Sequence, residues 1–100
     1  MITHIWSMTF TEQATAEQRA AFVDATAALP SQIEGVTSFR SGVDLGLSSG
    51  NYDVSIVAEF ADEHAWRAYI EDPAHVAFVE NHVTPLCASW GAIQMASPSV

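Results

Sequence analysis

The stretch from Tyr52 to Phe60 constrains the fold more than any other part of the chain, because one of its two faces is entirely apolar and the other is mostly polar. One face consists of Tyr52, Val54, Ile56, Ala58 and Phe60, and the other of Asp53, Ser55, Val57 and Glu59. A period of two residues is typical of a β-strand that buries one face. Other segments must therefore supply the partner strands and a cover for the apolar face.

Three other segments are predicted strands. Residues 2–10 have the same period, and His4 lies on their apolar face, so its side chain is expected to point toward the covered side of the sheet. Residues 36–43 form another strand, and a loop rich in glycine and serine at residues 44–51 joins it to the alternating stretch. Residues 88–96 form the last strand.

Two helical regions are predicted between these strands. A capping box at residues 15–18 opens the first, and Pro30 marks its end. The second region is interrupted: Asp62 caps one segment, and the Asp-Pro pair at residues 72–73 begins another that covers residues 74–84.

The order of elements is β-α-β-β-α-β, which predicts an α+β fold of the ferredoxin-like type, with an antiparallel sheet and both helical regions on one face. A chain of 100 residues leaves no room for a second core. We therefore expect one domain over residues 1–97 and a short C-terminal tail at residues 98–100.

The composition indicates that the chain pairs with itself. Hydrophobic residues make up 49% of the chain and charged residues 15%, against a usual charged share of about 25%. The uncovered face of the predicted sheet carries Ile5, Phe39, Val43 and Val57. We expect two sheets to pack face to face in a homodimer, and we expect Asp53 and Glu59 to pair with Arg40 across the sheet.

Charge and targeting signals exclude several partners. The net charge is −9, with three arginines and no lysine, which argues against binding to nucleic acid or to anionic membranes. Residues 1–6 do not resemble a secretory signal, and no apolar run reaches the roughly 20 residues of a membrane span, so a cytoplasmic location is expected. Cys87 is the only cysteine and is expected to act as a small buried hydrophobe.

Three residues are candidates for acid-base chemistry. His4 can move a proton near neutral pH, and His75 lies in the first turn of a helix, where a neutral ring able to act as a base is favoured. The phenol of Tyr69 could donate a hydrogen bond to a developing oxyanion. The alternative for each residue is a structural role in the core.

The other histidines do not suggest a metal site. His64 follows the acidic helix start and is expected to be solvated, whereas the position of His82 is ambiguous. No HExxH motif or close ligand cluster occurs, so no metal and no other cofactor is expected. A pocket for an apolar or aromatic ligand could be lined by large side chains, and the alternative, which is favoured for each of them taken singly, is that they fill a core. They are Trp6, Phe22, Trp66, Phe78, Leu86 and Trp90.

Five stretches together resemble the stress-responsive A/B barrel (Dabb) family of dimeric α/β-barrel proteins. They are Ile2-Thr3-His4-Ile5, Gly35-Val36 with Gly42-Val43-Asp44, Tyr52-Asp53, Glu59-Phe60, and Tyr69-Ile70-Glu71-Asp72-Pro73-Ala74-His75. The resemblance implies a ferredoxin-like protomer whose sheet packs on that of a second copy to make a barrel.

The resemblance also bears on function. The family includes stress-induced proteins and a plant polyketide cyclase that closes an aromatic ring by aldol condensation with a histidine and a tyrosine. His75 and Tyr69 occupy the positions of those residues. Thr26 stands where the cyclase has a second tyrosine and Val54 where it has another histidine, so both are expected to line the same cavity.

Two functions are therefore expected. The first is a cofactor-independent cyclase or isomerase that acts on a small, partly apolar carbonyl compound through His75, Tyr69 and His4. The second is a non-catalytic dimer that serves as a ligand carrier or stress-associated protein.

Overall fold

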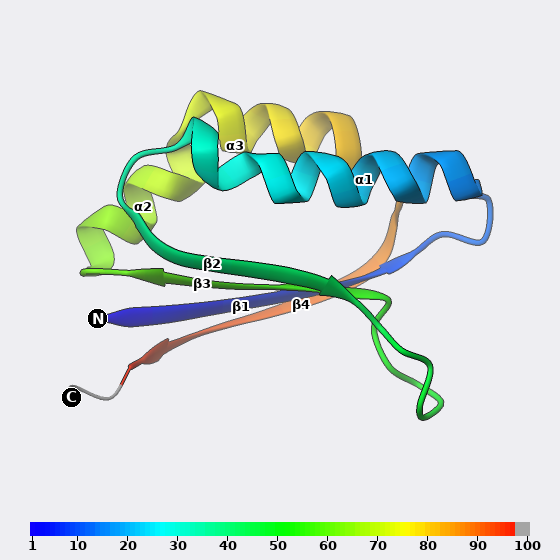
Figure 1. Ribbon diagram of the computed structural model, residues 1–100. Coiled ribbons are helices and arrows are strands. Elements are labelled where there is room, and N and C mark those ends of the chain that lie inside the picture. The colour runs from blue at the N-terminus through cyan, green and yellow to red at the C-terminus, as the bar shows by residue number, and fades with distance from the viewer. Residues whose placement is uncertain (98–100) are drawn as a thin grey trace.

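The computed structural model describes residues 1–97. The chain folds into a four-stranded antiparallel sheet with helices on one face (Figure 1). The strands are β1 (Ile2–Phe10), β2 (Val36–Val43), β3 (Val54–Phe60) and β4 (Cys87–Ala96), and their order in the sheet is β2-β3-β1-β4. This confirms the predicted ferredoxin-like fold. The predicted tail at residues 98–100 lies outside the described residues.

The helices begin at the predicted caps. They are α1 (Ala16–Ala28), the 3₁₀ turn η1 (Leu29–Gln32), α2 (Glu63–Glu71), α3 (Pro73–Phe78) and the π-helical turn η2 (Val79–Val83). Thr15 and Gln18 form the reciprocal capping box, and the side chains of Asp62 and Asp72 cap α2 and α3. The helical segment predicted over residues 74–84 is confirmed, and its second half, Val79–Val83, has the wider π form.

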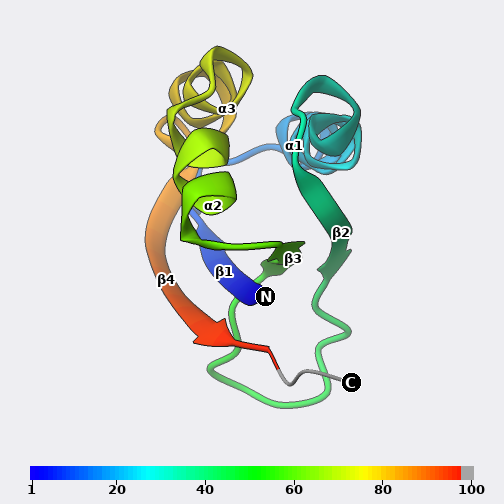
Figure 2. The ribbon, with the colours of Figure 1, turned by 90° about the vertical axis from the view of Figure 1, so that its left-hand side faces the viewer.

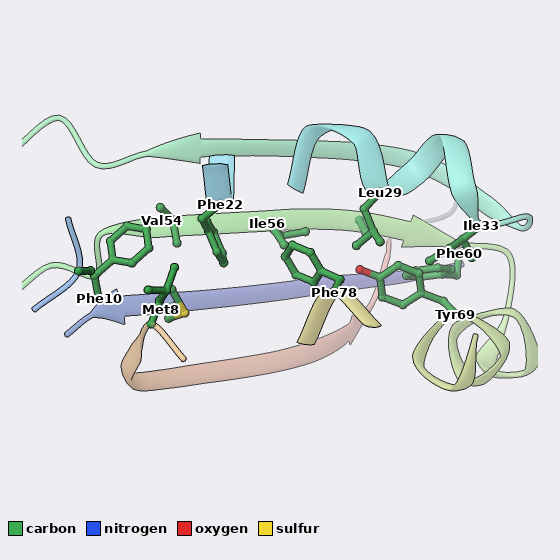
Figure 3. Packing of buried hydrophobic residues seen from close by; sticks show 13 residues of the cluster. Met8, Phe10, Phe22, Leu29, Ile33, Val54, Ile56, Phe60, Tyr69 and Phe78 are labelled. Carbon is green, nitrogen blue, oxygen red and sulfur yellow. The ribbon is translucent and has the colours of Figure 1, made fainter. Parts of the chain in front are cut away.

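The two helical regions cover different halves of the sheet. Viewed along the strands, α1 lies over the β2 side and α2 with α3 lies over the β4 side (Figure 2). Large apolar side chains fill the centre between the layers, among them Met8, Phe22, Leu29, Phe60 and Tyr69 (Figure 3). This division of the sheet determines which predicted pocket residues can meet.

The alternating stretch is buried on one face as predicted, with a later start. Val54, Ile56, Ala58 and Phe60 are all buried. The strand begins at Val54, however, and Tyr52 lies in the preceding loop, where it is exposed. On β1, His4 pairs with Ala58 and is itself buried, so it points toward the helices as expected.

The prediction that Phe39 and Val43 lie on the uncovered sheet face is wrong. A register shift between Val36 and Ser38 inserts one extra residue into β2, and Phe39 then pairs with the buried Ala58. Such a bulge reverses which side chains face the helices. The uncovered face instead takes Ile93 and Met95 from β4, which pair with Ile5 and Thr3 of β1.

The predicted cross-strand ion pairs of Arg40 are also wrong. Arg40 pairs with Val57 in the β2–β3 ladder, and within residues 1–97 the ion pair is Arg67 with Glu63, one turn apart on α2. The carboxylate of Asp53 accepts a hydrogen bond from the backbone N–H of Phe10 at 2.8 Å.

The loop between β2 and β3 leaves the sheet on the side away from the helices (Figures 1 and 2). Asp44 holds it in shape by accepting hydrogen bonds from the Gly46 N–H and the Asn51 side chain. Leu45 and Leu47 are 83% and 85% exposed. This segment therefore presents two apolar side chains on an ordered scaffold.

The residue that ends this loop reaches across the uncovered face of the sheet to β4. A β-carbon added at Gly91 would lie 2.8 Å from the Tyr52 hydroxyl oxygen, which is closer than real β-carbons approach. A larger residue at position 91 would therefore displace the exposed Tyr52 ring from its present place.

Candidate functional site

A cavity of about 610 Å³ lies between the β1–β4 half of the sheet and the α2, α3 and η2 segments. His4, Tyr69 and His75, the three candidates for acid-base chemistry, all line it. Trp66 and Phe78, predicted to contact a ligand, line it as well. Residues from the first strand and from the second helical region therefore meet at one site.

His4 is held by hydrogen bonds on one of its ring nitrogens. The indole N–H of Trp66 donates to its Nδ1 at 3.3 Å, and the side-chain nitrogen of Gln94 lies 2.9 Å from the same atom. Burial lowers the pKa of His4, and the nearby His75 lowers it further. His4 is therefore a neutral ring at neutral pH.

Tyr69 and His75 meet because the helical region is broken between them. The Asp72 side chain ends the break by accepting a hydrogen bond from the backbone of Ala74, which starts α3 in a new direction. The ring centroids of Tyr69 and His75 consequently lie 4.6 Å apart. Burial lowers the pKa of His75, whereas the Ile70 backbone and the Asp72 carboxylate partly oppose that shift.

The phenol of Tyr69 is a protonated group that faces the cavity. Burial raises its pKa to about 12. Within residues 1–97 its hydroxyl has no hydrogen-bond partner. Every fully buried polar side-chain atom in those residues does have one, so the Tyr69 oxygen is not fully buried. Because Tyr69 lines the cavity, its oxygen is reachable from there. Figure 3 shows the oxygen directed along the sheet toward Phe78. A ligand oxygen could accept a hydrogen bond there.

The remaining wall is predominantly apolar. It is formed by side chains that include Trp6, Ile70, Val79, Val83 and Trp90. Among the described residues that line the cavity, none is Asp, Glu, Lys or Arg. Electrostatic interactions inside it are therefore set by the two histidines, the phenol and a few neutral polar groups.

The other predicted ligand-contacting residues lie elsewhere, which corrects the expected pocket. Phe22, Thr26 and Val54 surround a separate space of only about 40 Å³ beneath α1. Leu86 is buried in the core and lines neither space. The reason is the division of the sheet, since α1 packs over β2 and β3 while the large cavity lies over β1 and β4.

Sequence reasoning missed Gln94 as a member of the site. It lies on β4 opposite His4 in the β1–β4 ladder and therefore shares the helix-facing side of the sheet. A polar residue among the alternating positions of the last strand was the available signal. The pairing of β4 with β1, and the register that places Gln94 opposite His4, are not evident from the sequence.

The remaining histidines take no part in this cavity. His64 is exposed on α2, and His82 lies beside Phe78 with 5.9 Å between ring centroids. No group of three or more His, Cys, Asp or Glu side chains in residues 1–97 is arranged to hold a metal ion. Over the same residues no helix is long and apolar enough to cross a membrane.

Several solved structures share this fold. A dimeric ferredoxin-like protein of unknown function from Thermobifida fusca is 33% identical, with a TM-score of 0.88 over 96% of this chain and 90% of that chain. A Dabb family protein from Mesorhizobium loti is 29% identical, with a TM-score of 0.81 over 98% and 97%. A hydroxynitrile lyase from Passiflora edulis is 14% identical, with a TM-score of 0.85 over 99% and 94%, which is a likeness of fold alone.

Sequence comparison agrees with the structural likeness. No curated protein sequence matches the chain significantly. The model of the stress responsive A/B barrel domain matches residues 2–96, which is almost all of the chain and includes every residue that lines the cavity. This chain therefore belongs to the stress responsive A/B barrel (Dabb) domain family.

Proposed function

We propose that the protein is a cofactor-independent acid-base enzyme that acts on a small, partly apolar carbonyl compound. One observation carries the proposal: a neutral histidine, His75, and a protonated phenol, Tyr69, lie side by side in a cavity whose other walls are largely apolar. Proton abstraction next to a carbonyl group needs a base of this kind and a hydrogen-bond donor at the oxygen.

The two residues divide the reaction between them. The neutral ring of His75 takes a proton from the carbon next to the carbonyl group, and the bond electrons move onto the carbonyl oxygen. The Tyr69 hydroxyl donates a hydrogen bond to that oxygen and stabilises its charge. The protonated His75 then returns its proton to the same carbon, to another carbon or to a new alkoxide, which gives exchange, isomerisation or aldol-type ring closure.

The fold is known to carry an enzyme of related type. The Passiflora edulis hydroxynitrile lyase has the same fold over 99% of this chain. A hydroxynitrile is a carbonyl compound with cyanide added, so its cleavage removes the hydroxyl proton, releases cyanide and forms a carbonyl group. That likeness shows that this fold can carry an enzyme, and it leaves the chemistry and the substrate of this chain to experiment.

We further propose that the chain forms a homodimer through the uncovered face of its sheet. Ile5, Ile93 and Met95 lie together on that face, and Ile93 and Met95 are 53% and 43% exposed. The β2–β3 loop, which carries the exposed Leu45 and Leu47, leaves the sheet on the same side (Figure 1). The Thermobifida fusca protein is also described as dimeric, which supports this arrangement.

Hydrogen-deuterium exchange of a model ketone tests the catalytic proposal without knowledge of the natural substrate. Aryl methyl ketones such as acetophenone are incubated with the protein in D2O, and loss of the methyl proton signal is followed by NMR. We expect catalysed exchange that His75→Ala reduces by roughly a hundredfold to ten-thousandfold. Tyr69→Phe, which keeps the ring, should reduce the rate as well.

His64→Ala is the matched control, because it removes an exposed histidine from the neighbouring helix. It should exchange at the rate of the unchanged protein. Binding of the ketone without any catalysed exchange, and with equal affinity in His75→Ala, would instead favour the ligand-carrier function.

A further inference from the structure

The hydrogen bonds at His4 determine which of its ring nitrogens carries the proton. An indole N–H can only donate, so Nδ1 of His4 must accept the bond from Trp66 through its lone pair. The lone pair is free only when the proton is on Nε2. His4 is therefore neutral in the Nε2–H form.

The same reasoning fixes the orientation of Gln94. Its amide group could present either an oxygen or a nitrogen to Nδ1, but an oxygen would face a lone pair. The nitrogen, 2.9 Å away, is the atom that can bond there. Gln94 reaches this position because it lies directly opposite His4 in the β1–β4 ladder.

Nε2 remains available to a ligand. It has no hydrogen-bond partner within residues 1–97, and in that part of the chain no buried polar side-chain atom is left without one. Because His4 lines the cavity, Nε2 is reachable from it. Two titratable groups face the His4 ring there. The ring centroid of Tyr69 lies 6.2 Å from that of His4. His75 is near enough for its charge to lower the pKa of His4.

We propose that Gln94 is a positioning residue that, together with Trp66, holds His4 in the Nε2–H form, so that His4 joins Tyr69 as a hydrogen-bond donor to the ligand oxygen. This inference rests on the proposed function and assigns the two histidines of the cavity different tasks. His75 moves the proton, whereas His4 remains neutral and binds the developing charge. An N–H group directed at the oxyanion can donate a hydrogen bond to it, whereas a bare ring nitrogen, which acts as a base, cannot.

The absence of a carboxylate among the described lining residues matters to this assignment. A carboxylate beside Nδ1 would accept a hydrogen bond and draw the proton to that nitrogen, which is the arrangement that prepares a histidine as a base. Gln94 differs from glutamate by one terminal group, and its amide nitrogen can donate to the bare Nδ1 that the Trp66 N–H requires. An amide at position 94 is thus compatible with a donor role for His4, whereas a carboxylate there would oppose it.

Nitrogen-15 NMR of the intact protein reads the tautomer directly, because a protonated and a bare imidazole nitrogen have well separated chemical shifts. In the unchanged protein near neutral pH we expect His4 to show a protonated Nε2 and a bare Nδ1. In Gln94→Glu we expect the proton to appear on Nδ1 and the pH midpoint of His4 to rise. His4→Gln assigns the signals by removing them.

Gln32→Glu is the matched control, since it makes the same change of charge at an exposed position of η1. It should leave the His4 signals unchanged. Gln94→Met is a second variant in case the added charge unfolds the chain, and it should weaken the preference for the Nε2–H form without adding a carboxylate. A bare Nε2 in the unchanged protein, or an unchanged tautomer in Gln94→Glu, overturns the proposal.

The exchange reaction supplies the functional arm of the test. Loss of one donor to an oxyanion typically lowers kcat by roughly a hundredfold to a thousandfold. We expect Gln94→Glu to lower kcat for ketone exchange by that order with a smaller change in KM, whereas Gln32→Glu should be unaffected. If the unchanged protein catalyses no exchange, the proposed function fails while the NMR result still decides the role of Gln94. If it catalyses exchange and Gln94→Glu is equally fast, the donor role of His4 fails and the proposed function stands.

Discussion

Burial acts on His75 and Tyr69 in opposite chemical directions although both face the same cavity. Desolvation disfavours the charged form of any group. It therefore lowers the pKa of His75, which keeps the ring neutral, and raises that of Tyr69 to about 12, which keeps the phenol protonated. A single physical cause thus prepares a base and a donor at adjacent positions.

These pKa shifts predict the pH dependence of catalysed ketone exchange. His75 acts as a base only when unprotonated, so kcat/KM should rise as the pH increases through an apparent pKa below 6.5. The rate should then stay level across neutral and mildly alkaline pH, because Tyr69 keeps its proton until about pH 12. Initial rates in D2O buffers over that range provide the measurement, and an alkaline fall centred near pH 8 would contradict it.

The strands and the helix starts could be predicted because they depend on local sequence, whereas the bulge in β2 could not. Alternation identified the strands, and the caps at Thr15, Asp62 and Asp72 identified the helix starts, because each depends on residues that are close in sequence. The bulge in β2 has no comparable local signal. It arises from pairing with β3, so the faces assigned to Phe39 and Val43 were reversed.

The candidate site shows the same limit. His4 could be placed on the helix-facing side from the period of β1, and Tyr69 and His75 from the resemblance to a known family. Gln94 required the register between β1 and β4, which joins residues 90 positions apart. Phe22 and Thr26 were assigned to the wrong space because sequence periodicity does not show which half of a sheet a helix covers.

The β2–β3 loop yields a prediction about assembly. If its exposed side chains contact the second copy, Leu45→Ser combined with Leu47→Ser should weaken the dimer, because both side chains would lose apolar contact. Analytical ultracentrifugation should show a dissociation constant raised by about tenfold or more. Ser48→Ala with Ser49→Ala, in the same loop, is the control and should leave dimerisation unchanged.

Such a result in the leucine variant would locate the loop in the interface. A dimer of unchanged affinity would mean that the leucines face solvent in the assembly, even if the sheets themselves pair.

For the whole molecule, the centre of the uncovered sheet face decides whether two copies can pair. Ile5 lies there between Val57 on β3 and Ile93 on β4. Ile5→Asp would place an unpaired charge against apolar neighbours, and we expect it to weaken the dimer by at least about a hundredfold. Light scattering at micromolar concentration should then give the mass of one chain.

Val57→Asp provides the comparison, because its carboxylate would lie opposite Arg40 and gain a partner. It should weaken the dimer less than Ile5→Asp. A monomeric unchanged protein would contradict the proposed dimer itself, and two equally stable dimeric variants would show that this face remains open to water.

The contact between Tyr52 and Gly91 also predicts that two distant positions of the chain covary in evolution. A β-carbon at position 91 would lie too close to the Tyr52 hydroxyl, so a side chain there requires the exposed Tyr52 ring to move aside or to be replaced. Among homologues, an aromatic ring at position 52 should therefore be found more often with glycine at position 91 than with a larger residue. Sequence variation at the end of the loop that carries Leu45 and Leu47 would then depend on the residue at position 91 of β4.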